Sequence, residues 1–302
     1  MKPVEIDVLC VGLATYDLVY QVDHHPGADE KCFAAGLVMG GGGPAANAAV
    51  TAARLGGTSA FAGYLGVDAF GQMHFEELVS EGVITSLVVR GDHLVPLSSI
   101  IVKPGGERTV VSHKGAAPVL EPDQVDFTKL RPRAILFDGH QPAISIPLAA
   151  KAKGQNIPAI LDAGSVHKGT VELAPLCGYL VASRKFARDF SGEKDPAQAL
   201  SFLSRMAPVA VITLGEAGII WASGHKSGSL GAFMVDAVDT TGAGDIFHGA
   251  FALAIARGEK LGFALRYASA ASALGCTKIG ARASIPTEAE VKAIMRNSLS
   301  ND

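Results

Sequence analysis

The chain has 302 residues, and its 26 Lys and Arg against 29 Asp and Glu give a formal net charge of −3. Apolar residues make up 48% of it, which excludes intrinsic disorder, because disordered chains are poor in apolar residues and rich in charge. The missing basic excess argues against a nucleic-acid-binding protein. No apolar run reaches the roughly 18 residues that a membrane span needs, and the N-terminus has no signal-peptide core, so we expect a cytoplasmic protein with no membrane partner.

The cysteines are scattered along the chain and form no Cys-x-x-Cys pair. Their spacing predicts neither a zinc site nor a disulfide framework, and a reducing compartment is their simplest environment. The four are Cys10, Cys32, Cys177 and Cys276.

The first part of the chain predicts strands and helices in alternation, with two interruptions. The apolar run at 8–12 is typical of a buried parallel strand, and the Ala-rich segment 44–55 contains no residue that breaks a helix. Two pairs of strand-like segments, the second around the turn 104–107, interrupt the alternation and predict a small β appendage. The predicted strands up to residue 113 are 8–12, 18–22, 33–39, 58–62, 98–103 and 108–113, and the predicted helices are 44–55 and 70–81.

From residue 134 onward the predicted alternation is regular. It favours the α/β class, with a doubly wound, Rossmann-like, mostly parallel sheet flanked by helices. We expect one domain over residues 1–302, with the β appendage inserted from about 15–39 and 97–114. The predicted strands of this part are 134–137, 159–161, 179–181 and 209–213, and the helices are 144–153, 196–206, 243–256, 261–274 and 287–296.

The most specific motif is the segment 239–245, Asp-Thr-Thr-Gly-Ala-Gly-Asp, directly before an apolar helix. Small residues at a helix N-terminus leave its free N–H groups open to an anion, which the helix dipole favours. Asp245 in the first turn would lie beside that anion and could accept a proton from a hydroxyl that attacks a phosphoryl group. By itself, the motif is equally compatible with a simple helix cap that has an acid in its first turn.

Two further Gly-rich segments lie next to regular elements. Four glycines at 40–43 precede the Ala-rich helix, where Asn47 would face either a ligand or solvent. The segment 213–218, Thr-Leu-Gly-Glu-Ala-Gly, is a strand end with turns that glycine permits. The patterns of a P-loop, a dinucleotide fingerprint, a nucleophile elbow and a zinc-protease helix are absent. His24 and His25 stand in a predicted turn, and we expect them to be solvated rather than metal ligands.

Together these segments resemble the ribokinase (PfkB) family of carbohydrate kinases over nearly the whole chain. The resemblance lies in Gly-Gly-Pro-Ala-Ala-Asn at 42–47, in Gly-x-x-Gly-x-Asp-x-x-Gly at 63–71 and, most specifically, in 239–245. It implies a doubly wound α/β domain with a small β-sheet lid, which would account for both interruptions. It also implies an enzyme that transfers the γ-phosphoryl group of ATP to a sugar hydroxyl.

By that resemblance, Asp245 is the base that deprotonates the sugar hydroxyl. The N–H groups of Gly242, Ala243 and Gly244 form the anion hole for the γ-phosphoryl group. Such positioning and electrostatic roles supply most of the catalysis in phosphoryl transfer. The positions that hold sugar hydroxyls are matched by Asp17, Gly43 and Asn47, and the candidate nucleotide-binding residues are Ser183, Thr213, Gly215 and Gly218.

The resemblance further implies Mg²⁺ with the nucleotide phosphates and K⁺ beside the anion hole. The family often carries Asn-x-x-Glu after the strand at 179–181, whereas this chain has Ser-Arg-Lys-Phe at 183–186, so the usual contacts of that Glu are missing. Ketohexokinases also have Ser at the first of these positions. The K⁺ ligands, largely backbone carbonyls, are expected at Asp239, Thr241, Gly275, Lys278, Gly280 and Ser284.

The segments 41–45, 239–250 and 276–286 look most like a bacterial branch that includes sulfofructose kinases, with ketohexokinases as neighbours. Many sugar kinases carry Asn in place of Pro44. In that branch a lid Lys and an Arg are expected to hold the sulfonate. Lys31 fits the first, although it could equally be a solvated lysine, and His140 stands in place of the Arg, which it replaces only in part. Asp29, an additional lid ligand, and Ser112 complete the candidate substrate-binding residues.

We therefore expect an ATP-dependent kinase that acts on a hydroxymethyl group of a ketose-like sugar, such as fructose or the 6-substituted sulfofructose. Two alternatives stay open. A nucleoside or ribose kinase would use the same chemistry, although the lid has few aromatic rings to stack a base, and a sugar-sensing protein of the same fold would lack catalysis. An exposed strand edge on the lid predicts a homodimer that pairs through the lid.

Overall fold

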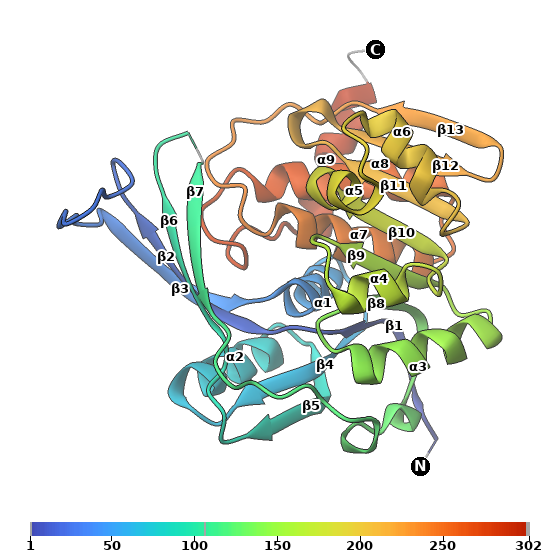
Figure 1. Ribbon diagram of the computed structural model, residues 1–302, viewed down its shortest axis with the longest axis horizontal. Coiled ribbons are helices and arrows are strands. Elements are labelled where there is room, and N and C mark those ends of the chain that lie inside the picture. Colours follow the sequence, from blue (N-terminus) through green and yellow to red (C-terminus); the bar gives the residue numbers. More distant parts are fainter. Residues whose placement is uncertain (1, 106, 300–302) are drawn as a thin grey trace.

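The computed structural model of the protein describes residues 2–105 and 107–299, so Gly106 of the predicted turn lies outside the described residues. One large sheet runs through the body, in the order β13-β12-β11-β10-β9-β8-β1-β4-β5, and a smaller sheet, β3-β2-β6-β7, stands at its side (Figure 1). The strands of the large sheet are β1 Val4–Val11, β4 Ser59–Gly66, β5 Ile84–Gly91, β8 Leu130–Phe137, β9 Ala159–Ala163, β10 Tyr179–Ser183, β11 Val209–Thr213, β12 Ile219–Ser223 and β13 Lys226–Leu230.

The large sheet is parallel from β5 to β11, and only the edge hairpin of β12 and β13 is antiparallel. Its central strands are buried on both faces, which explains the continuous apolar run that begins at Val8. The predicted doubly wound α/β class is therefore confirmed. The edge hairpin and β5 were not predicted, because β13 is largely polar and β5 buries only one of its residues fully.

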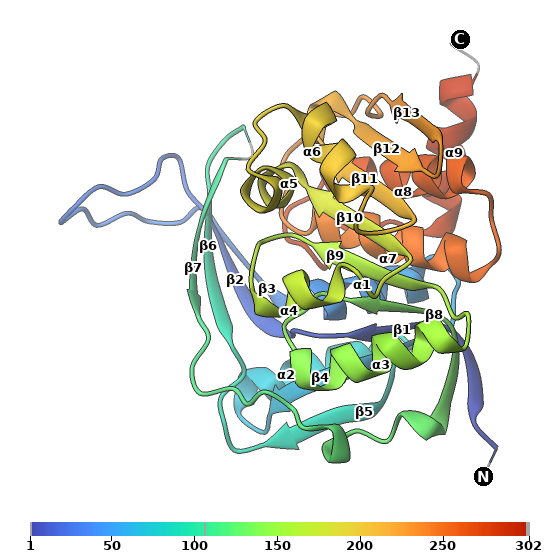
Figure 2. The same ribbon diagram turned by 45° about the vertical axis from the view of Figure 1, so that its right-hand side comes forward.

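Helices cover both faces of the large sheet (Figure 2). One face packs against α1 Pro44–Arg54, α2 Ala69–Ser80, α7 Ala243–Ala256, α8 Leu261–Gly275 and α9 Glu288–Leu299. The other packs against α3 Pro142–Gly154, α4 Lys168–Leu173, α5 Arg184–Ser191 and α6 Pro196–Leu203. The short helices α4 and α5 were not predicted from the sequence. Within the described ranges, no helix is both long and apolar enough to cross a membrane.

The helices α1 and α7 pack closely because their contact surface is built from very small side chains. A Cβ atom on Gly249 of α7 would lie 2.5 Å from the carbonyl oxygen of Ala48 on α1, which leaves no room for a larger residue. The N-terminal ends of both helices therefore lie side by side at the edge where the parallel strands end. In open α/β sheets this is the edge that binds ligands.

The small sheet forms the predicted β appendage, which we call the lid. Its hairpins β2–β3 and β6–β7 are antiparallel and join through parallel pairing of β2 with β6. Its own core is only Val19, Ile100 and Val102, packed with Val38 and Ile279. The loop 22–35 projects away from the body (Figures 1 and 2). The lid strands are β2 Thr15–Gln21, β3 Gly36–Gly42, β6 Leu97–Val102 and β7 Arg108–His113. The strand predicted at 33–39 therefore starts three residues too early, since β3 starts at Gly36.

Candidate active site

Asp245 and Asn47 meet where the N-terminal ends of α7 and α1 come together. The Asn47 side-chain amide donates a hydrogen bond of 2.7 Å to Asp245 Oδ2. Burial and the neighbouring carboxylate of Asp162 together raise the pKa of Asp245 to about 7, although the bond from Asn47 and the charge of His248 act in the opposite direction. A buried carboxylate with a pKa near neutrality suits a group that accepts a proton at physiological pH.

The predicted anion hole lies in the first turn of α7. Gly242 is the N-cap with φ +76, and a Cβ there would lie 2.6 Å from Cβ of Ala281, so the turn and the packing both require glycine. Gly244 is different, because no atom outside the neighbouring backbone of α7 lies within 4 Å of where its Cβ would stand. The Ala243 N–H is engaged in a turn bond of 3.3 Å to the carbonyl of Thr240. The open space at Gly244 beside a helix N-terminus fits an anionic ligand.

A buried arginine, Arg282, fixes the orientation of Asn47. Its Nε donates to Asn47 Oδ1 at 3.1 Å, so the two ends of the Asn47 amide are held by different partners. Its Nη2 lies 3.1 Å from Nε2 of His74, and its Nη1 lies 3.7 Å from Glu77 Oε1. Arg282 was not predicted from the sequence; the available signal was a lone Arg within the small and apolar segment 280–285.

Asp17 lies on the inner face of the lid, toward the body. Burial raises its pKa, while hydrogen bonds from Thr15 and Ser98 and the charge of Arg282 lower it. A Cβ on Gly42 would lie 2.1 Å from Asp17 Oδ2, so the glycine makes room for this carboxylate. The strand register places Asp17, Ser98 and Ser112 in one row, with 3.1 Å between the two serine hydroxyls. Predicted residues Asp17 and Ser112 therefore share the lid surface that faces the body.

Asp138, at the end of β8, ties the turn after β1 to the start of α1. Its carboxylate accepts bonds from the backbone N–H groups of Leu13 at 2.7 Å, Ala45 at 3.2 Å and His140 at 2.8 Å. This holds the predicted His140 beside the N-terminus of α1, where Gly43 is the N-cap with φ +93. The His140 ring stacks on His167 with 4.6 Å between centroids. Neither Asp138 nor His167 was predicted from the sequence.

The candidate nucleotide-binding residues lie farther along the same edge of the sheet. Thr213 ends β11, and Gly215 and Gly218 have φ of +64 and +84, as predicted for turns that require glycine. Gly218 also has a packing role, since a Cβ there would lie 2.0 Å from the carbonyl oxygen of Leu230. The Ser183 hydroxyl caps α5 by accepting from Phe186 N–H at 2.9 Å, and it donates to the carbonyl of Gly164 at 2.8 Å.

The residues expected around a monovalent cation form a connected loop pair. The Asp239 carboxylate accepts from the N–H and hydroxyl of Thr241 at 2.8 and 2.6 Å and from the N–H of Gly280 at 2.9 Å. Ser284 donates its hydroxyl to the carbonyl of Ala281, which leaves the oxygen lone pairs free to accept. These oxygen donors fit a hard cation. Gly275 packs against Ile246, and the Lys278 side chain lies 3.7 Å from Glu290, which leaves only its backbone for such a site.

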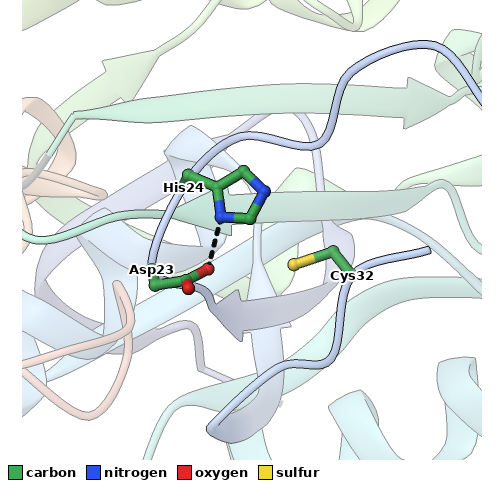
Figure 3. A group of neighbouring side chains, drawn as sticks. All are labelled: Asp23, His24 and Cys32. Atoms are coloured by element: carbon green, nitrogen blue, oxygen red, sulfur yellow. Dashed lines mark hydrogen bonds and ion pairs between the residues drawn. The ribbon is translucent and has the colours of Figure 1, made fainter. Parts of the chain in front are cut away.

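The lid loop 22–35 lies apart from this constellation. Asp29 and Lys31 are exposed on it, with Lys31 Nζ placed 5.1 Å from the centre of the Phe33 ring, and the structure does not bring either residue to Asp17 or Asp245. Figure 3 shows His24 beside Asp23 and Cys32, whose ligand-type atoms lie within 4.8 Å of one another. His24 bonds to Asp23 at 2.6 Å and to Glu30 at 2.5 Å, so these exposed groups satisfy one another and hold the loop.

The lid also contacts the segment that precedes α7. The Arg108 guanidinium at the start of β7 donates to the hydroxyl of Thr240. A cavity of about 720 Å³ lies beside this contact and is lined by both residues together with His25 and Val110. The lid therefore touches the body next to the candidate anion hole.

Known proteins resemble this chain over most of its length. The ribokinase of Bacillus subtilis is 29% identical over 297 residues, which cover 96% of this chain and 99% of the relative. A fructokinase of Solanum tuberosum is 29% identical and covers 87% of this chain and 88% of the relative. The solved ribokinase of Thermotoga maritima has a TM-score of 0.83 at 26% identity, over 97% of this chain and 100% of that chain. The pfkB family carbohydrate kinase model matches residues 5–288, and the chain therefore belongs to the PfkB family of carbohydrate kinases.

Proposed function

We propose that this PfkB-family sugar kinase uses ATP to phosphorylate a hydroxymethyl group of a ketose-like sugar, fructose or a 6-substituted fructose such as sulfofructose. ATP-dependent phosphorylation of a sugar agrees with the ribokinase and fructokinase relatives. The observation that carries the proposal is the hydrogen-bonded chain of Arg282, Asn47 and Asp245, because it holds the Asp245 carboxylate in one orientation in the first turn of α7.

In the proposed reaction, Asp245 accepts the proton of the sugar hydroxyl as that oxygen attacks the γ-phosphoryl group. Asn47 donates to the same carboxylate and keeps it oriented. The first-turn N–H groups around Gly242 and Gly244 would stabilise the charge of the transferred group, since they lack partners within the helix. Asp17, from the lid side, would hold sugar hydroxyls as an acceptor. Closure of the lid over the sugar would exclude water and so limit hydrolysis of ATP.

The pKa of Asp245 predicts how the rate depends on pH. Because burial raises this pKa to about 7, Asp245 is protonated at lower pH and cannot act as a base there. We expect kcat/KM to rise with pH through about 7 and to level off above it. The range from roughly pH 5.5 to roughly pH 8.5 extends about one and a half units on either side of this pKa. If kcat/KM stayed constant over that range, a base with this pKa would be contradicted.

Two cations complete the proposal. Mg²⁺ would enter with the nucleotide phosphates, since segment 183–186 supplies no carboxylate for it. K⁺ would lie among the oxygens of Asp239, Thr241, Gly275, Lys278, Gly280 and Ser284 and would shape the anion hole. We expect higher turnover in K⁺ than in Na⁺ or a large organic cation at equal ionic strength, and equal rates in all three would contradict this site.

We further propose a cytoplasmic homodimer that pairs through the outer face of the lid. Leu37, Met39 and Val111 on this face are 51%, 50% and 64% exposed, although they stand on a well-formed sheet. A second copy of the lid would cover them and bury apolar area. Sedimentation of the wild type beside Met39→Lys would test this, since a charge on that face should favour the monomer.

The deciding experiment measures ADP release with Mg-ATP and K⁺ over a panel of acceptors: fructose, fructose 6-phosphate, sulfofructose, ribose, 2-keto-3-deoxygluconate and adenosine. Turnover on a ketose supports the proposal, and preference for an anionic ketose would support roles for Lys31 and His140. Ribose is the second candidate, because ribokinases are prominent among the relatives. Turnover on adenosine alone would contradict the sugar assignment. No turnover with ATP still bound would favour a sensing protein.

A further inference from the structure

A buried histidine, His248, lies beneath the candidate anion hole. It is 4% exposed and stands one helical turn after Gly244 on α7. Its Nδ1 lies 2.6 Å from the carbonyl oxygen of Gly244 and 3.3 Å from Oδ2 of Asp162, at the end of β9. Its Nε2 lies 3.2 Å from the carbonyl oxygen of Val181 on β10. Each ring nitrogen therefore faces oxygen acceptors.

The charged groups that contact or act on this ring in the described part of the chain are two carboxylates. Asp245 faces it from α7 and Asp162 from β9, while β10 contributes the Val181 carbonyl. Asp138 on the β8 side acts on Asp162, and Asp17 on the lid acts on Asp245. A positive charge on His248 would therefore have two carboxylates close by and two more behind them.

The hydrogen-bond geometry decides where the proton of this pair lies. Burial lowers the pKa of His248 and raises that of Asp162 to about 8, so desolvation favours the neutral form of both groups. A neutral imidazole, however, carries one N–H and one lone pair. In either neutral tautomer, the unprotonated ring nitrogen would direct its lone pair at a carbonyl oxygen, that of Gly244 or that of Val181, which can only accept a hydrogen bond. Only the imidazolium can donate on both sides, to Gly244 and to Val181.

We propose that His248 is a buried imidazolium paired with the carboxylate of Asp162, and that this pair positions the anion hole and keeps Asp245 ionised. The proposal rests on the proposed role of Asp245 as the base. The positioning follows from peptide geometry, because the C=O and N–H of a trans peptide point in opposite directions. With the Gly244 carbonyl held by His248, the N–H of Asp245 points the other way, toward the open end of α7. His248 is thus a positioning residue and touches no reactant.

Two variants with opposite charge effects test the pairing. His248→Asn removes the positive charge, so the pKa of Asp245 should rise and the acid limb of kcat/KM should move to higher pH by about one unit. Asp162→Asn removes a negative charge, so the acid limb should move to lower pH by a similar amount. A neutral His–Asp pair would give no shift in either variant, because neither substitution would then change the charge. A merely structural role would lower kcat without moving the limb.

His225→Asn provides the matched control, since His225 is exposed in the turn between β12 and β13. We expect its pH profile to coincide with that of the wild type. If the acid limb moved in the same direction in His248→Asn and Asp162→Asn, or moved in neither, the proposed ion pair would be overturned.

A second measurement does not depend on activity, since it reads the charge of His248 in the wild-type protein. Bonds to Glu30 and Asp23 raise the pKa of the exposed His24, which accounts for one signal with both nitrogens protonated. In ¹⁵N-histidine spectra of the wild-type protein, we expect a second such signal, from His248, at a pH well above the ordinary histidine pKa of about 6.5. Its absence from the spectrum of His248→Asn assigns the signal. A neutral tautomer at this position would overturn the proposal. If no sugar is phosphorylated, the proposed function fails, but this spectrum still decides the charge of His248.

Discussion

The candidate active site has two sides that are built differently. On the body side, buried groups are cross-linked to one another: Arg282 to Asn47, Asn47 to Asp245, and Asp138 to three backbone N–H groups. On the lid side, β7 is exposed along its whole length, and the lid core consists of Val19, Ile100 and Val102 with two flanking residues. The lid meets the segment before α7 through Arg108 and Thr240, which are both exposed.

This difference separates two tasks. A buried hydrogen bond is costly to leave unmade, at about 1–3 kcal/mol, so the body side holds its groups in one arrangement. Exposed contacts contribute far less, and elements with a small core open more easily. We infer that the chemistry depends on the body side, whereas the lid controls access and affinity. Substitutions on the two sides should therefore differ in the size and the kind of their effects.

The largest effect is expected from Asp245→Asn. The amide keeps the size of the carboxylate but cannot take the proton, so kcat should fall by about 10³-fold. Sugar affinity, measured by calorimetry or fluorescence, should stay within several-fold of the wild type. The free energy of unfolding should not fall, because the variant no longer buries a carboxylate. Loss of sugar binding together with turnover would instead make Asp245 a structural residue.

The next prediction compares substitutions at two glycines of the candidate anion hole, Gly244 and Gly242. Gly244→Ala should fold normally, because no atom outside the neighbouring backbone of α7 lies within 4 Å of the added Cβ, but the methyl group would occupy the space meant for the anion. We expect kcat/KM to fall by about 10²-fold without a change in the free energy of unfolding. Gly242→Ala should destabilise the fold by about 1–3 kcal/mol, because φ is +76 and Ala281 is in the way. Full activity in Gly244→Ala would remove the anion hole from this turn.

Arg282→Gln should have a smaller effect on the rate and a clear effect on stability. The shorter side chain cannot serve Asn47 and Glu77 together, so Asn47 loses its fixed orientation and kcat/KM should fall by about 10-fold. Removing one partner of a buried charge pair costs about 3 kcal/mol, to be measured by denaturant unfolding. The matched control is Arg131→Gln, whose exposed pair with Glu5 is 3.8 Å long and should contribute under about 1 kcal/mol. Equal losses in both variants would contradict the buried network.

The sequence could predict those features whose residues are neighbours in the chain. The contiguous motifs predicted the β appendage, the helix that begins at Ala243 and the N-terminal position of Asp245 on it. Gly242, Ala243 and Gly244 are neighbours in the chain, so their common location needs no long-range information. The edge strands of the large sheet, β5 and β13, were less well predicted, because they carry mixed polar and apolar residues.

Asn47 was predicted, but the other groups that support Asp245 come from or contact distant parts of the chain and were missed. Arg282 is 235 residues from Asn47, and His248 contacts Val181 across 67 residues. Nothing in a local pattern tells whether a single Arg or His faces solvent or a buried acid. Asp138 and Asp162 left a better signal, since each is a charged residue at the carboxyl end of an apolar strand, where α/β proteins place functional groups. The lid residues Asp29 and Lys31 stay predictions, because they stand on a loop that projects from the body.

The smallest effect is expected from Arg108→Ala, which removes the hydrogen bond between the lid and the body. This bond to Thr240 is exposed, so the free energy of unfolding should change by less than about 1 kcal/mol. Without it, the lid should remain open for longer, and KM for the sugar should rise several-fold while kcat stays within about twofold. The KM of Arg108→Lys, which keeps the charge but not the guanidinium, should fall between the KM of the wild type and that of Arg108→Ala. A 100-fold loss of kcat in Arg108→Ala would instead place Arg108 among the groups that stabilise the transferred phosphoryl, and the chemistry would then belong to the lid as much as to the body.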